Sequence, residues 1–96
     1  MTRRLRWTNR AVRRLEGIGD YIAQDNPTAA EQAVGRLRAV VEHLVSHPAM
    51  GRSGRITGTR ELVLTGIPYI IAYRVTESTV DILTIMHTSQ RWPERL

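Results

Sequence analysis

Residues 58–87 are the most informative stretch of this chain, because three short apolar runs are separated by tight turns, with Arg60 and Arg74 in the first two and His87 at the end of the third. The middle run, IPYIIAYRV, is apolar on both faces and holds Arg74 near its end. An arginine is seldom placed in such a run without a partner for its charge. The pattern predicts consecutive antiparallel strands over residues 60–65, 69–75 and 79–86. What pairs with their arginines is therefore the first question about function.

The turns between these strands suggest two pairings. If the last turn is symmetric about its two central residues, Arg74 lies opposite Asp81 and a cross-strand ion pair accounts for it. If the preceding loop has three residues, Arg60 lies opposite Arg74, and two facing arginines need an anion or a carboxylate between them. Glu61 would point to the other face of the sheet, which makes it a poor partner for Arg60. A slip of one residue would reverse these facings.

The segment before these three strands is predicted to form one further strand and two helices. Residues 3–7 alternate apolar and basic side chains, which predicts a short first strand, and apolar residues recur at helical spacing over 9–25. The NP dipeptide at 26–27 ends this helix and starts a second, capped by the asparagine or by the threonine after the proline. The HP dipeptide at 47–48 closes it. We expect one α+β domain over residues 1–96, with a helical hairpin on one face of a mostly antiparallel sheet.

The charge and composition of the chain limit the kinds of partner that it is expected to bind. The 14 basic residues are all arginines and face nine acidic residues, which gives a formal net charge of +5. A basic surface favours nucleic acid or an acidic protein segment, although the use of arginine without lysine is also typical of a GC-rich genome. The chain has no cysteine, which excludes disulfides and thiolate metal sites. No apolar run is long enough to span a membrane. We expect a cytoplasmic protein without cofactor or metal.

Further candidate residues flank the strands. Arg52 and Arg55 lie in the glycine-rich segment 49–58, which predicts a basic loop, with room for a short strand, that contacts phosphate or simply faces solvent. His87 ends the last predicted strand near Arg91. It is either a hydrogen-bonded strand end or a general acid or base for RNA cleavage. Such cleavage requires proton removal from a 2′-hydroxyl, protonation of the leaving oxygen and a cation at the phosphate.

The order of these pieces resembles the RelE/ParE superfamily of toxins from type II toxin–antitoxin modules. The resemblance covers nearly the entire chain and is carried by YIAQDNPTAA, HPAMGRSGR and the closing YRV…ILTIMHTSQRWP. The long paired helices and the MH strand end are more similar to the ParE branch, whose members poison DNA gyrase. The fold implied is an N-terminal strand, an α-helical hairpin and an antiparallel β-meander.

RelE-like members of this superfamily instead cut mRNA on the ribosome with a basic, tyrosine-containing site. By position, Arg60 matches an arginine of that nuclease pattern, Arg91 falls near another, and Arg52 and Arg55 stand where the pattern has lysines. The C-terminal catalytic tyrosine of the pattern is missing here, although His87 could take its place. The resemblance therefore favours a gyrase inhibitor that is not an enzyme over a nuclease.

Three functions stay open at this point: a gyrase poison, an mRNA endoribonuclease, and a basic RNA- or protein-binding module without toxicity. The catalytic residues, if the chain is a nuclease, are predicted to be Arg60, Arg74, His87 and Arg91. The predicted binding residues for phosphate, target or antitoxin are Arg52, Arg55, Arg60, Arg74, Arg91 and Trp92. The resemblance also implies a cognate antitoxin whose extended or helical tail covers the toxin, with operator DNA contacted only through that antitoxin.

Overall fold

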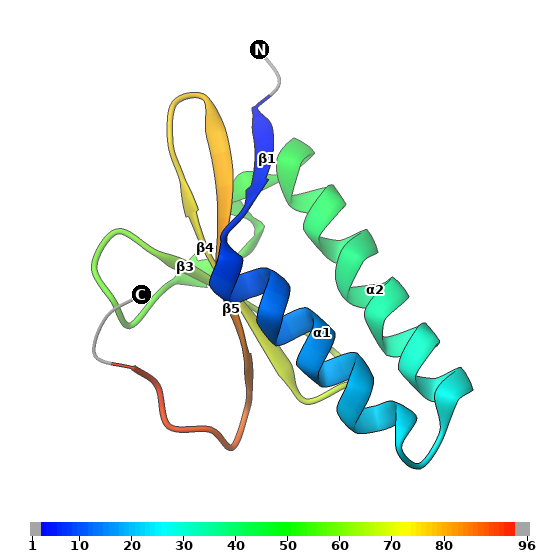
Figure 1. Ribbon diagram of the computed structural model, residues 1–96. Helices are drawn as coiled ribbons and strands as arrows, with labels where there is room; N and C mark the ends of the chain where they lie inside the picture. Colours follow the sequence, from blue (N-terminus) through cyan, green and yellow to red (C-terminus); the bar gives the residue numbers. More distant parts are fainter. Residues whose placement is uncertain (1–2, 94–96) are drawn as a thin grey trace.

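The computed structural model describes residues 3–93, so the predicted domain extends at both ends beyond the described part. Along the chain, one strand is followed by two helices, a 3-10 turn and four strands (Figure 1). Their bounds are β1 Arg4–Trp7, α1 Asn9–Ala23, α2 Pro27–Ser46, the 3-10 turn Pro48–Met50, β2 Arg52–Ser53, β3 Arg60–Val63, β4 Tyr69–Val75 and β5 Thr79–His87.

The strands form one sheet in the order β1-β5-β4-β3-β2. The pairs from β2 to β5 are antiparallel, as predicted, whereas β1 runs parallel to β5. Figure 1 shows α1 and α2 side by side against one face of this sheet, which confirms the α+β architecture with a helical hairpin. The parallel pair had no sequence signal, because alternation identifies a strand but not its neighbour.

Both helices begin where side-chain caps satisfy their first backbone N–H groups. The Thr8 hydroxyl accepts from the N–H of Ala11, and the Asn26 side chain accepts from the N–H of Ala29. Asn26 has extended backbone angles and is followed by Pro27 at the first helical position, so α1 cannot run through it. Of the two predicted caps for α2, Asn26 is the one used. For the same reason α1 ends at Ala23, short of the predicted residue 25.

One apolar core lies between the helices and the sheet. The predicted helical stripes supply its buried side chains from one side, and alternate residues of β4 and β5 supply them from the other. Each fully buried aliphatic side chain contributes roughly 1.5–3 kcal/mol to stability. The most enclosed members are Leu37, Val41, Leu44, Ile71, Tyr73, Val80, Ile82 and Ile85. No helix within residues 3–93 is long and apolar enough to cross a membrane.

The strand registers confirm one predicted pairing and correct the other. Arg74 lies opposite Asp81, as predicted from the symmetric turn. Arg60 lies opposite Tyr73, so the predicted facing of Arg60 and Arg74 is wrong. The reason is the loop between β3 and β4: Leu64 hydrogen-bonds to Tyr69 across a four-residue connection, one residue longer than that pairing needs. Gly66 in this loop has a φ of 83°, a conformation that glycine adopts without strain.

Thr8 offers a test of how the helices are tied to the sheet. Its hydroxyl caps α1 and also donates to the carbonyl of Ile82 at 2.8 Å. We expect Thr8→Ala to lower the free energy of unfolding by about 1 kcal/mol or more, because a cap and a tertiary hydrogen bond are lost together. Urea denaturation of the isolated chain measures this. Thr8→Ser keeps the hydroxyl and should lose much less; equal losses for both would show that the hydroxyl is not the cause.

Candidate functional site

Asp81 is the centre of a charge cluster on the sheet face opposite the helices. Its side chain is almost fully buried, and Arg6 donates to its two carboxylate oxygens at 3.0 Å and 3.3 Å. Arg6 lies opposite Asp81 on β1, and Arg74 lies opposite it on β4. The hydrogen bond from Arg6, with the charges of Arg6 and Arg74, holds the pKa of Asp81 below its usual value. The predicted partner of Arg74 is therefore in place, but the direct hydrogen bonds come from β1.

Glu61 forms a second buried centre on the same face. Only 3% of its surface is exposed, and its carboxylate accepts from Arg52 Nη2 at 3.2 Å and from the backbone N–H of Arg55 at 2.7 Å. The Arg55 guanidinium lies 3.5 Å from the same carboxylate. Burial alone would raise the pKa of Glu61, but these hydrogen bonds and charges together lower it. Glu61 does point away from Arg60, and it positions the two loop arginines instead.

Arg60 has a structural role at the corner that leads into β2. Its Nη1 donates to the carbonyl of Gly51 at 2.7 Å. The buried hydroxyl of Tyr73 accepts from the N–H of Gly51 at 2.8 Å and donates to the carbonyl of Pro48 at 2.7 Å. A Cβ on Gly51 would lie 2.6 Å from that hydroxyl, so the corner needs glycine. Arg60 thus fixes the backbone that carries the basic loop.

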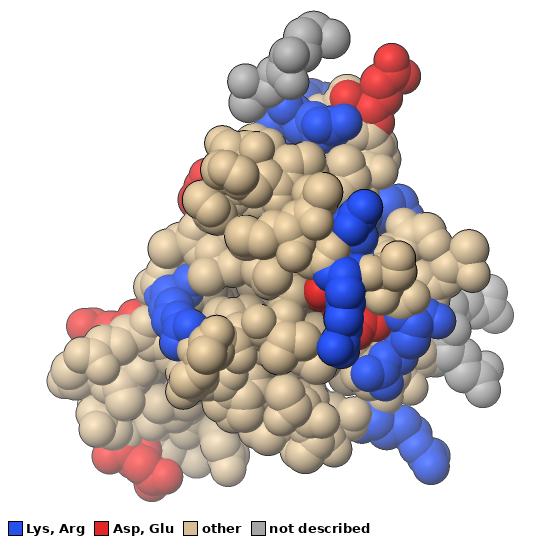
Figure 2. Space-filling model, turned by 180° about the vertical axis from the view of Figure 1, so that it is seen from behind, with Lys and Arg blue, Asp and Glu red and all other residues tan. Residues whose placement is uncertain are grey.

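The segment after β5 contacts the loop between β2 and β3, which carries Arg55. The Arg55 guanidinium lies over the ring of Trp92, 4.1 Å from its centroid, in a cation–π contact. Trp92 is half-buried and its neighbour Arg91 is exposed. Seen from behind the view of Figure 1, Figure 2 shows arginines gathered in a band with acidic atoms visible among them. We call the set of Arg52, Arg55, Arg74, Arg91 and Trp92 the basic face.

His87 lies at the other end of β4 from Arg74. It pairs with Tyr69 at the start of β4, whereas Arg74 is near the end of that strand. Five residues of strand separate the two positions by roughly 16 Å. The structure therefore brings Arg52, Arg55 and Trp92 together and places Arg74 beside Asp81. It does not gather Arg60, Arg74 and His87 around one point.

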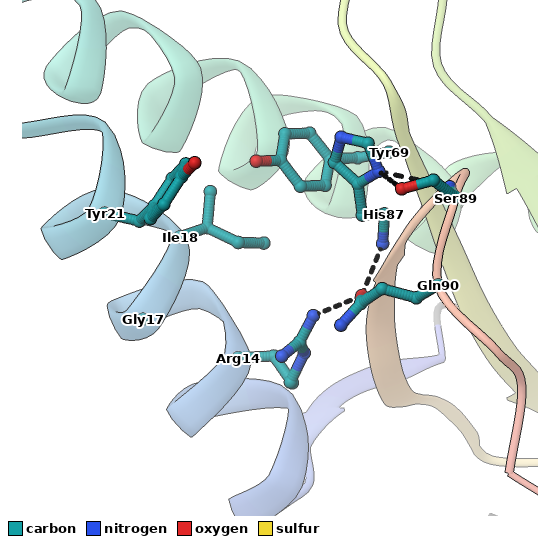
Figure 3. Close-up of a pocket in the computed structure, with 8 residues that line it drawn as sticks. All are labelled: Arg14, Gly17, Ile18, Tyr21, Tyr69, His87, Ser89 and Gln90. Atoms are coloured by element: carbon teal, nitrogen blue, oxygen red, sulfur yellow. Dashed lines mark hydrogen bonds between the residues drawn. The ribbon is translucent and has the colours of Figure 1, made fainter.

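His87 instead lines a cavity of about 530 Å³ between α1 and the ends of β4 and β5 (Figure 3). Its Nδ1 accepts from the backbone N–H of Ser89 at 3.1 Å, and its ring stands edge-on to Tyr69 with centroids 5.4 Å apart. Arg14 donates to the carbonyl of Ile85 at 3.0 Å and to Gln90 Oε1, which also accepts the N–H of His87.

Tyr69 in this cavity has no counterpart among the residues predicted from the sequence. Burial raises the pKa of the Tyr69 hydroxyl, more than the nearby charge of Arg14 lowers it, so the hydroxyl keeps its proton. The one available signal is the helical spacing of Arg14, Gly17 and Tyr21, which puts them on one stripe of α1. Nothing in that spacing identifies the strand end they face.

Comparison with known proteins gives one family. The model of the ParE toxin of the type II toxin–antitoxin system parDE matches residues 5–92. The chain is 54% identical over 94 residues to Y4kP, a candidate toxin of Sinorhizobium fredii, across 98% of this chain and 97% of that protein. It is 39% identical over 84 residues to toxin RelE2 of Caulobacter vibrioides, across 88% and 93% of the two chains.

Among solved structures, a chain of the chromosomal ParDE toxin–antitoxin system of P. aeruginosa has the same fold. The TM-score is 0.82 at 30% sequence identity, and the match covers 92% of this chain and 98% of that one. The agreement therefore extends over the helical hairpin and the sheet together.

The two buried carboxylates predict a loss of stability in acid. Their pKa values are lower in the folded chain than in the unfolded one, so their contribution is present above about pH 4 and disappears as pH falls through the folded values. We expect the unfolding free energy to drop below pH 4, and to drop less steeply in Asp81→Asn and Glu61→Gln. Urea denaturation at several pH values measures the slopes. Glu31→Gln, which removes an exposed carboxylate of α2, is the control and should keep the parent slope.

Proposed function

Because this chain belongs to the ParE toxin family of type II toxin–antitoxin systems, we propose that it arrests growth by binding DNA gyrase and blocking replication. The observation that supports a binding mode of action is the separation of the residues that a ribonuclease would need in one place. On this proposal the toxin breaks no bond of its own and acts through its surface. A target of this kind, and a partner antitoxin, place its action in the cytoplasm.

The distances argue against a nuclease site built from the predicted residues. Cleavage of RNA needs a proton acceptor, a proton donor and a cation within a few ångströms of one phosphate. His87 lies roughly 16 Å along β4 from Arg74, and the Arg60 guanidinium is held on the carbonyl of Gly51. Bringing them together would break the hydrogen bond of Arg60 to Gly51 and the pairing of His87 with Tyr69.

The basic face is the surface that we propose contacts the gyrase target or the antitoxin. Two of its arginines, Arg52 and Arg55, are held in position by Glu61, so less of their side-chain freedom is lost when an acidic partner binds. Trp92 adds a large ring of the kind that is enriched in protein interfaces. An antitoxin tail rich in carboxylates would cover this face and neutralise the toxin, and operator DNA would be reached only through the antitoxin.

A ribosome-dependent mRNA endoribonuclease is the second candidate, favoured by the 39% identity to a protein named toxin RelE2. In that case the residues that catalyse RNA cleavage would be Arg60, Arg74, His87 and Arg91. The two candidates differ in what accumulates in a cell: broken or trapped DNA in one case, and cleaved mRNA in the other.

Expression of the chain without its antitoxin separates these candidates. We expect a DNA-damage response, intact mRNA, and inhibition of supercoiling by purified gyrase in vitro. His87→Ala should remain as toxic as the parent chain, since no catalytic role is assigned to it. Prompt mRNA cleavage at ribosomes that His87→Ala abolishes would reject the gyrase proposal in favour of the nuclease.

Charge reversal on the basic face tests where the target binds. Arg91 is exposed and its side chain makes no hydrogen bond or ion pair within residues 3–93, so Arg91→Glu should leave the fold largely intact. We expect about tenfold more of this variant to be needed for gyrase inhibition, because a like charge now faces the acidic partner. Arg38→Glu makes the same charge change at an exposed position of α2 and should inhibit like the parent chain. If the parent chain and both variants inhibit gyrase equally, the basic face is not the surface that binds the target.

A further inference from the structure

We propose that the cavity between α1 and the ends of β4 and β5 binds an oxyanion, a carboxylate or a phosphate, that is carried on a flat apolar body. This inference stands on the geometry of the cavity and does not depend on whether gyrase is the target. The cavity shares no lining residue with the basic face, and neither the gyrase proposal nor the nuclease alternative accounts for its shape.

The first support is the hydroxyl of Tyr69. The residue is only 7% exposed, yet within residues 3–93 its hydroxyl has no hydrogen-bond partner, and Figure 3 shows it pointing into the cavity. The contrast with Tyr73 is direct, since that hydroxyl makes two hydrogen bonds. No side-chain polar atom of the described residues is both buried and unpaired, so this hydroxyl reaches the open space of the cavity, where it can donate to a ligand.

The side chains of His87 and Arg14 offer further donors at the cavity. Nδ1 of His87 accepts from Ser89 N–H, which puts the ring proton of the neutral histidine on Nε2. The Arg14 guanidinium uses Nε and Nη2 in its two hydrogen bonds, and the remaining N–H groups of its five are left for a ligand. None of the described residues that line the cavity is acidic. A cavity that offers donors and a fixed positive charge selects an oxyanion.

The apolar part of the ligand follows from the wall formed by α1. Gly17 lies in the middle of the helix, where glycine is unfavourable, and no atom lies within 4 Å of the Cβ it lacks. The missing side chain leaves room in the cavity. Beside it, Tyr21 is 73% exposed and Ile18 is buried, and both line the cavity, so a flat ring can lie against an aromatic and an aliphatic side chain.

The ligand has two possible sources: a small aryl carboxylate or phosphate, or an acidic side chain of the bound antitoxin that lies next to an aromatic one and presents the same chemistry. The second source rests on the antitoxin partner proposed above. Probe binding in the isolated toxin tests the shared chemistry, and probe binding in the toxin–antitoxin complex distinguishes the sources. In the complex, retained binding indicates a small molecule. Loss of binding, together with a weaker complex in Gly17→Leu, indicates an antitoxin side chain.

The test uses phenylphosphonate and benzoate as probes and benzamide as the uncharged control. Binding of each compound to the full chain is measured from changes in its amide NMR shifts. We expect saturable shifts around the cavity for the two anions and none for benzamide. Tyr69→Phe should weaken anion binding by about tenfold, since a hydrogen bond to a charged group is lost, without lowering the urea midpoint, because the hydroxyl has no partner to lose. Tyr73→Phe should do the reverse: lower the midpoint and leave the affinity unchanged.

Filling the cavity gives an independent test. Gly17→Leu adds a side chain in the open space at the cavity and should abolish binding of the anions. Gly35→Leu makes the same change in α2, also in open space but away from the cavity, and should bind like the parent. The proposal is overturned if neither anion binds saturably, if benzamide binds as well as benzoate, or if Gly17→Leu leaves the affinity unchanged.

Discussion

The buried hydroxyl of Tyr73 holds the corner on which the basic face depends. It joins the carbonyl of Pro48 to the N–H of Gly51, and Arg60 bonds the carbonyl of the same glycine. The corner sets the path of the chain from α2 into the edge of the sheet. Without it, the loop that carries Arg52 and Arg55 would have no fixed position relative to Glu61. A residue in the middle of the core therefore determines the geometry of a surface that is built from charged groups.

Two buried carboxylates organise most of that surface. Asp81 and Glu61 each lie on the sheet face without helices, and each bonds at least one arginine that is itself mostly exposed. Exposed ion pairs contribute little to stability, but a buried carboxylate without its arginine would be strongly destabilising. The arginines are thus required by the fold and at the same time face outward toward a partner. The arginines in the apolar strands need no external anion to explain their presence.

Much of the architecture could be predicted because its signals are local. Helical periodicity and the NP junction locate the hairpin, and a two-residue turn puts Arg74 opposite Asp81. The predicted pairing of Arg60 with Arg74 was wrong because the loop before β4 has one more residue than assumed, which changes the register. The cavity around His87 could not be predicted at all. Its walls come from α1, two strands and the segment after β5, which only tertiary packing brings together.

The parallel pairing of β1 with β5 has a consequence for how the protein is made. The first strand finds its neighbour in the last, and contacts such as Arg6 with Asp81 join residues that are 75 positions apart. During translation, β1 leaves the ribosome long before its partner exists, so the sheet is completed only when synthesis has passed residue 87. A chain that stops before β5 lacks the strand that joins β1 to β4, so its first strand has no place in the sheet.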